Sequence, residues 1–205
     1  MWRGLALTLA AVALASSFSV ARGDAAVAES VETLVRAQLK NRVTTLSPSR
    51  TSAPQRTRAN SAMAVLENTV LDRMNQVRRA HGLRLLRLNS RLRAAALFHS
   101  NDMGRRGYFE HDSLSGTVFW RRIERFYPSR GFRSWTVGEN LLWGSGTYGA
   151  AFAVREWMNS PPHRENLLSR EWREVGIGAV HFSSAPGEYR RRPVTIMTAD
   201  FGARR

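Results

Sequence analysis

Residues 157–168 read WMNSPPHRENLL and mark the point where a predicted helix gives way to a polar segment. The helix starts near Thr147, and its apolar residues, Trp157 among them, recur at the spacing of one helical face. It stops before Pro161, because a proline disfavours the helical conformation of the residue that precedes it. His163 follows two residues later, so the sequence places an imidazole directly beside a predicted core helix.

Outward from this stretch, the hydrophobic pattern predicts three earlier helices and three strands. The predicted elements are helices at about 65–81, 90–104 and 118–126, and strands in part of 135–143 and at 174–182 and 194–201. Asn89 or Ser90 can cap the second helix. Because the strands come late in the chain and the helices mostly before them, the pattern indicates an α+β sandwich.

The composition excludes several classes of protein. The chain has 205 residues, of which 43% are hydrophobic, so it has enough apolar material for a core and is not wholly disordered. It has no cysteine, which excludes a disulfide scaffold, a cysteine-ligated metal site and a thiol nucleophile. The formal net charge of +15 predicts an anionic partner.

The basic residues after the second helix form two groups in the sequence. The groups are Arg121, Arg122, Arg125, Arg130 and Arg133 around the third helix, and the run 190–192. A solvated, solubilising surface accounts for them without any partner. Because no nucleic-acid reader fold is recognisable, we expect no nucleic acid; an anionic cell-envelope polymer or lipid headgroups are the partners that the charge favours.

The N-terminal residues predict export. Residues 1–23 contain Arg3, then an apolar run and then small residues, which is the layout of a secretory signal peptide. The apolar run is shorter than the ~20 residues of a membrane span, so we expect no span after signal cleavage, with an uncleaved anchor helix as the alternative. Residues 24–61 are poor in large apolar residues and predict a flexible basic linker, whereas residues 62–205 form the predicted domain. The protein is therefore expected to be secreted or held in the cell envelope.

Three short polar segments lie beside predicted core elements and contain His111, Glu139 and His163: GYFEHDS, GENL and SPPHRENL. Two imidazoles and one carboxylate can hold a divalent metal such as zinc, with open positions for water or substrate. Without metal, the same groups can act as general acid and base. Spacing alone does not show that the three segments converge.

The polar segments belong to a longer ordered set of strings: LDRMNQVRRAHGLRLLRLNSRLRAAALFHSNDM, GYFEHDS, GENLLWG, WMNSPPHRENLL and EVGIGAV. This set resembles the CAP superfamily of cysteine-rich secretory, antigen-five and pathogenesis-related proteins, whose domain is also called SCP, and in particular its bacterial, cysteine-free branch. The resemblance implies an α–β–α sandwich with a small central antiparallel sheet between helices, and a cavity lined by two histidines and two acids. His111 and His163 match the two histidines and Glu139 the first acid, but Ser160 stands at the second acidic position.

Each candidate residue also has a plainer interpretation. His111 can bond within its own turn, Glu139 can accept from loop amides, and His163 can begin a short helix after the prolines. Asn166 is expected to fix its loop through side-chain bonds to the backbone, and His99 to pack in the core. A serine hydrolase is not favoured, because no G-x-S-x-G elbow surrounds the candidate serines.

Three functional hypotheses follow. The first is a binding module whose cavity, with His111, Glu139 and His163, holds a small ligand, lipid, glycan or peptide and a weakly bound divalent metal. The second is a hydrolase of peptide or envelope substrate that uses metal-activated water or acid–base catalysis. The third is a purely structural envelope domain. Ser160, in place of a second acid, favours the first and third hypotheses over the second.

Overall fold

The computed structural model describes residues 53–205, and these residues are built around one four-stranded sheet. The strands, in spatial order, are β1 (Arg87–Leu88), β3 (Glu174–Phe182), β4 (Val194–Arg204) and β2 (Trp135–Ser145). β4 is antiparallel to both of its neighbours, whereas the short β1 runs parallel to β3. The three long strands lie where the alternating apolar pattern predicts them, and a 3₁₀ turn, η1 (Gly187–Tyr189), lies in the β3–β4 connection.

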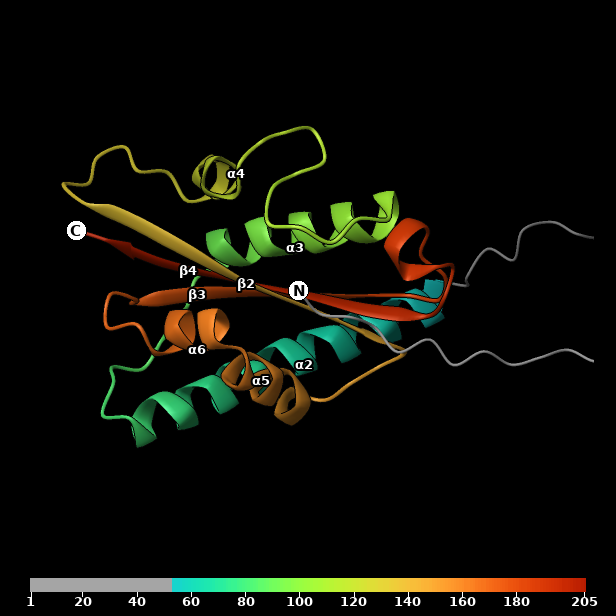
Figure 1. Cartoon of the computed structure of the whole chain (residues 1–205), viewed down its shortest axis with the longest axis horizontal. Coiled ribbons are helices and arrows are strands. Elements are labelled where there is room, and N and C mark those ends of the chain that lie inside the picture. The colour runs from blue at the N-terminus through green and yellow to red at the C-terminus, as the bar shows by residue number, and fades with distance from the viewer. Residues whose placement is uncertain (1–52) are drawn as a thin grey trace, which may run out of the picture. The chain divides into compact units, whose positions relative to one another are not determined.

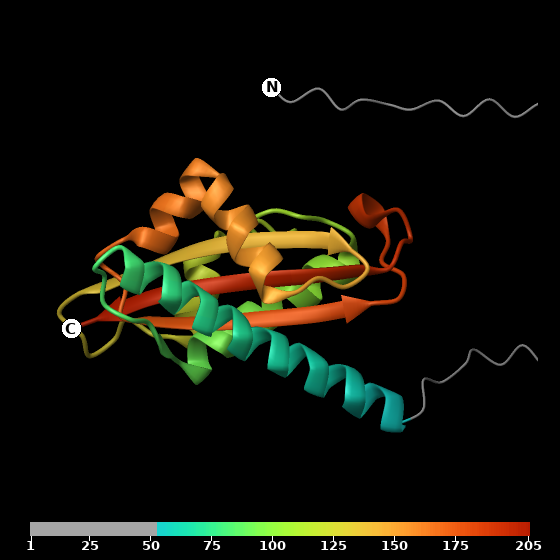
Figure 2. The same cartoon turned by 90° about the horizontal axis from the view of Figure 1, so that it is seen from below.

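Helices cover both faces of the sheet (Figures 1 and 2). One layer contains α2 (Ala53–Ala80), α5 (Ala150–Asn159) and α6 (Pro161–Leu168). The other contains α3 (Ser90–Arg106) and α4 (Phe119–Phe126). The predicted α+β class and the α–β–α sandwich are therefore confirmed.

The helix α3 shows how the sequence fixes one of these layers. Asn89 caps it, because its side-chain oxygen accepts from the backbone N–H groups of Arg91 and Leu92 at 2.9 and 3.2 Å. Gly107 ends it in the left-handed conformation, at φ 74°. The buried face of α3 includes Leu92 and His99, as the pattern predicts.

Three apolar clusters pack against the sheet. The first fills the space towards α2 and α5 around the fully buried Trp157 and Phe201. The second lies towards α3 and α4 and contains Leu92 and Ile123. The third joins Met103 of α3 to the start of β4. Packing of this kind, without a metal or a disulfide, supplies the stability that a chain lacking cysteine needs.

The structure differs from the sequence prediction at several boundaries. The polar segment 161–168 is helical along its length and forms α6, which confirms the short helix of the plainer interpretation of His163; Pro161 lies at its first turn, where a proline needs no hydrogen-bond partner. α5 begins at Ala150 rather than near Thr147, and α2 begins at Ala53, before the predicted start of the domain.

The predicted signal peptide and the first 29 positions of the predicted linker, up to residue 52, lie outside the described residues. Within the described part of the chain, no helix combines the length and the apolar character that a membrane span requires.

Candidate functional site

A buried ion pair joins β2 to α4. The side chains of Glu139 and Arg122 are each only 1% exposed, and one terminal nitrogen of Arg122 donates to Oε2 of Glu139. The other terminal nitrogen donates to the backbone carbonyl of His111 at 2.7 Å. Arg122 therefore fixes both the carboxylate and the loop that carries the first histidine. The prediction that Arg122 belongs to a solvated surface is wrong, because Arg122 lies on the inner side of α4 beside Ile123.

His111 completes this arrangement at the surface. Its Nδ1 lies 2.7 Å from Oε1 of Glu139, while its side chain is 49% exposed. Burial opposes ionisation of Glu139, but the hydrogen bond from His111 and the charge of Arg122 hold the pKa of this carboxyl below its usual value. An ionised carboxylate only accepts hydrogen bonds, so we assign the imidazole proton to Nδ1, which leaves Nε2 able to accept a proton or a ligand.

His163 is attached to the same strand through two asparagines. Asn140 donates to the backbone carbonyl of His163 at 2.9 Å. The amide nitrogen of Asn166 donates to the Asn140 side-chain oxygen at 2.9 Å and to the Glu139 backbone carbonyl at 3.1 Å. Asn166 therefore has the structural role predicted for it. Burial, and then the positive charge that His111 carries when protonated, lower the pKa of His163.

Asp200 is a further member of the site that sequence reasoning missed. It lies directly opposite Glu139 in the pairing of β2 with β4 and is fully buried. Neither of its carboxyl oxygens has a hydrogen-bond partner among the described residues. Burial and the neighbouring charge of Glu139 raise the pKa of Asp200 well above its usual value. One signal was available: a single carboxyl group in the apolar strand sequence 194–203.

His99 and Ser160 have the plainer roles. His99 is fully buried on α3, its Nε2 lies 2.9 Å from the Glu110 carbonyl, and burial lowers its pKa to about 4. It is therefore a neutral packing residue near pH 7, as predicted. Ser160 joins α5 to α6 and supplies no carboxylate.

The contacts of Glu139 leave it poorly suited to bind a divalent metal. Both carboxylate oxygens of Glu139 are occupied, by His111 and by Arg122, and a guanidinium beside a carboxylate opposes a cation there. Within the described range, no group of three or more His, Asp or Glu side chains is placed to hold an ion. The residues therefore do not fit a three-ligand site with Glu139 as a ligand. The predicted metal role of His111, Glu139 and His163 stays a prediction, and the contacts favour Glu139 as the support of His111.

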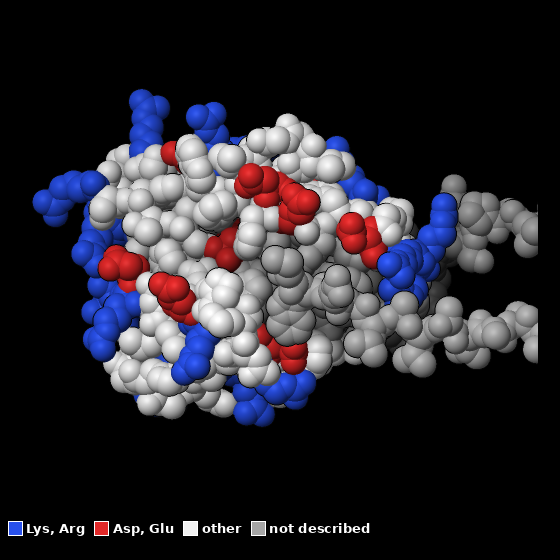
Figure 3. Space-filling model, in the orientation of Figure 1, with Lys and Arg blue, Asp and Glu red and all other residues white. Residues whose placement is uncertain are grey.

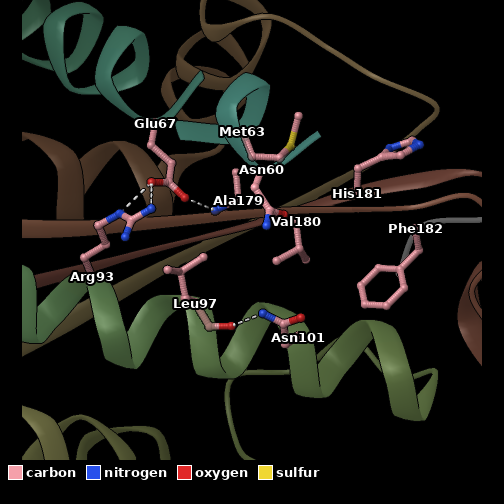
Figure 4. Close-up of a pocket in the computed structure, with 10 residues that line it drawn as sticks. All are labelled: Asn60, Met63, Glu67, Arg93, Leu97, Asn101, Ala179, Val180, His181 and Phe182. Atoms are coloured by element: carbon pink, nitrogen blue, oxygen red, sulfur yellow. Dashed lines mark hydrogen bonds and ion pairs between the residues drawn. The ribbon is translucent and has the colours of Figure 1, made fainter. Parts of the chain in front are cut away.

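A separate pocket of about 390 Å³ lies between α2, α3 and the outer edge of β3 (Figure 4). At one end of it, Glu67 pairs with Arg93 at 2.6 Å and accepts from the backbone N–H of Ala179 at 3.0 Å. The carboxylate of Glu67 is thus the hydrogen-bond acceptor for a backbone N–H group at the edge of the sheet. His111, Glu139 and His163 do not line this pocket.

A protein-family model matches more than half of this chain. The model of the cysteine-rich secretory protein family, CAP, matches residues 71–198. The matched range includes every motif from which the resemblance was inferred, and the resemblance is confirmed.

Individual relatives agree with this match. YkwD of Bacillus subtilis (strain 168) is 33% identical over 129 residues, which are 62% of this chain and 48% of YkwD, so the chain spans about half the length of that relative. An extracellular protein of Bacillus anthracis str. Ames that contains an SCP domain matches with 26% identity and a TM-score of 0.55, over 76% of this chain and 43% of that one. An outer surface protein from Borrelia burgdorferi shares the fold, with 22% identity and a TM-score of 0.51 over 66% of this chain and 90% of its own.

Proposed function

The chain belongs to the cysteine-rich secretory protein family, CAP, and on that premise we propose that it is an exported binding module that holds a small ligand at the imidazoles of His111 and His163. Export is part of the proposal: residues 1–23 have the layout of a signal peptide, and the similar Bacillus anthracis protein is described as extracellular. The ligand would then be a component of the cell envelope or its surroundings.

The contact between His111 and Glu139 is the observation that supports this proposal most. A buried carboxylate is costly to desolvate, and here it is held by a buried arginine and aimed at a half-exposed imidazole. A contact with an exposed imidazole ring adds little to the stability of a buried ion pair. In a binding site, however, the same contact holds the imidazole in a fixed orientation for a ligand. Perturbed carboxyl groups that support an exposed histidine are typical of functional sites.

The surroundings of His111 favour a glycan or a peptide over a lipid chain. The His111 ring meets the ring of Phe119 edge to face, with 6.2 Å between centroids, and the next residue, Trp120, is 40% exposed. Aromatic faces combined with a few fixed polar groups suit ligands that are part apolar and rich in hydroxyl, amide or carboxylate groups. A lipid tail would leave the two imidazoles without partners.

A hydrolase is the second candidate, and the same contact supports it. An imidazole whose Nδ1 donates to a buried carboxylate has its Nε2 positioned to take a proton from water or substrate. His111 would be the base and Glu139 its positioning residue, with no metal in the step.

Calorimetric titration with muramyl dipeptide, which contains a sugar, amides and carboxylates, tests the proposal. We expect binding by the wild type and at least tenfold weaker binding by His111→Ala and by His163→Ala. His181→Ala, an exposed histidine on β3, serves as the matched control and should bind as the wild type does. Equal binding by all four proteins would contradict the proposal.

Chromatography of the recovered probe separates the two candidates. Intact muramyl dipeptide after long incubation supports the binding module, and cleavage that depends on His111 supports the hydrolase. Loss of thermal stability in His111→Ala, with no ligand bound by the wild type, would instead support the purely structural domain.

A further inference from the structure

One end of the sheet collects arginines from four segments of the chain. β1, β2 and β3 begin here and β4 ends here. The residues of this basic end, as we call it, are Arg84, Arg87, Arg133, Arg173, Arg204 and Arg205. Figure 3 shows basic atoms along the left rim of this face, which is the end where the C-terminus lies in Figure 1.

Backbone contacts hold these arginines close to one another. The N–H of Arg87 donates to the carbonyl of Arg173 at 3.1 Å, and the N–H groups of Arg133 and Ser134 both donate to the carbonyl of Arg205. Partial burial, and then the positive charges of Arg84 and Arg205, lower the pKa of Arg173. The guanidinium groups are thus near enough to repel one another, and an anion at this surface would relieve that repulsion.

The acidic side chains nearby neutralise only part of the basic end. Glu174 accepts from the hydroxyl of Tyr127 at 2.6 Å and from Asn89 at 3.0 Å, so its oxygens are already engaged. Glu171 is the other acid close to Arg173. Six arginines therefore face only two carboxylates, and the surface keeps a net positive charge.

Exposed apolar side chains accompany these charges. Leu85, Leu88 and Phe132 are 38%, 48% and 43% exposed, and they are three of the seven large hydrophobic residues exposed in the described part of the chain. The guanidinium of Arg204 lies over the ring of Tyr127 at 3.7 Å and over Phe132 at 4.4 Å. Arg84, Arg87, Leu85 and Leu88 are all exposed, so basic and apolar side chains lie close together along this segment.

We propose that the basic end is a docking surface for an anionic lipid bilayer. Arginines near an anionic bilayer are attracted to the phosphates of its headgroups, and leucine and phenylalanine side chains can enter the boundary between headgroups and acyl chains. A soluble anionic polymer would satisfy the arginines but would give the three apolar side chains no partner. The surface is separate from the His111 site, and it would bring the proposed binding module close to a membrane from outside.

A fluorescent label at Leu88 tests the contact directly. Because the chain has no cysteine, Leu88→Cys creates a single labelling site, and Glu188→Cys creates a matched one at the other end of the sheet. With the full chain and phosphatidylglycerol vesicles, an environment-sensitive dye at position 88 should shift to the blue and brighten, and the dye at position 188 should not. No change at position 88, or equal changes at both positions, would overturn the proposal. Because the readout is local, any contribution of residues 1–52 to vesicle binding does not affect it.

Charge reversal then tests whether the arginines act through their position. Arg84→Glu/Arg87→Glu should weaken vesicle binding at least tenfold, whereas Arg190→Glu/Arg192→Glu, the same change of charge at the opposite end of the sheet, should leave it within twofold. Equal losses would show that net charge alone acts, and would overturn the docking surface.

The leucines distinguish a bilayer from a polymer. Leu85→Ser/Leu88→Ser should weaken binding to the vesicles but leave binding to soluble polyphosphate unchanged. Vesicle binding equal to that of the wild type in this variant would overturn the bilayer as the partner. Vesicles of phosphatidylcholine alone should bind none of the variants, and strong binding to them would contradict the role of the anionic headgroup.

Discussion

Glu139 is the residue on which the candidate site depends. It lies between a buried arginine and a half-exposed histidine, and each of its two carboxylate oxygens accepts a hydrogen bond from one of them. An ion pair of this kind adds little net stability compared with an apolar pair, but it becomes costly as soon as one partner is removed. The pair is therefore better understood as a device that orients His111 than as a source of stability.

Glu139→Gln tests this account of the pair. The glutamine can still accept from His111, but it leaves the Arg122 charge buried without a counter-ion, and we expect a loss of about 3 kcal/mol in the free energy of unfolding. Chemical denaturation measures the loss. Arg122→Met/Glu139→Gln is the control, because it removes both charges and should recover most of the stability; an unchanged midpoint in the single variant would contradict the account.

Asp200 makes a prediction about pH. Its pKa is raised in the folded protein, so above the ordinary aspartate pKa the folded state keeps a proton that the unfolded state releases. The contribution of Asp200 to stability must then fall as the pH rises from about 4 towards the folded pKa, by about 1.4 kcal/mol per pH unit. Asp200→Asn removes this slope and should become more stable than the wild type as the pH rises towards 7. If the difference in the free energy of unfolding between the two proteins stays constant from pH 5 to pH 7, the raised pKa of Asp200 is contradicted.

The elements of the fold differ in how far the sequence predicts them. Helix α3 and the three long strands could be predicted, because their caps and apolar patterns are local. β1 could not, since two residues carry no periodicity and their pairing with β3 depends on the finished sheet. The same holds for the candidate site. His111 and Glu139 could be predicted because they stand in short sequence motifs. Arg122 and Asp200 could not, because only the packing of α4 and the register of β4 bring them to the site.

The packing of α3 on β3 gives a prediction at this scale. Gly178 faces the helix backbone so closely that an added Cβ would lie 2.3 Å from the nitrogen of Leu97 and 2.5 Å from the carbonyl carbon of Ala96. Backbone cannot move aside as a side chain can, so Gly178→Ala should cost about 3 kcal/mol or more. Gly149→Ala, where a Cβ meets nothing within 4 Å, is the control and should cost less than about 1 kcal/mol. Thermal melts of equal midpoint would show that α3 does not pack this closely.

For the molecule as a whole, we predict that folding does not depend on metal. Apolar clusters pack on both faces of the sheet, and His111 and Arg122 contact the oxygens of Glu139. We therefore expect EDTA to leave Tm unchanged, and added zinc to bind weakly and to be released in acid, because imidazole binds metal only when it is neutral. Global unfolding in EDTA, or zinc retained through dialysis at pH 5, would contradict this expectation.

The central claim, that His111 and His163 form one binding face, is tested most directly by following the imidazoles themselves. The chain has five histidines, and nuclear magnetic resonance resolves each ring during a titration with muramyl dipeptide: His81, His99, His111, His163 and His181. The account predicts that the ring signals of His111 and His163 shift together, with one shared dissociation constant, while the other three stay in place. Shifts confined to the other histidines, or a response of His111 without His163, would contradict it.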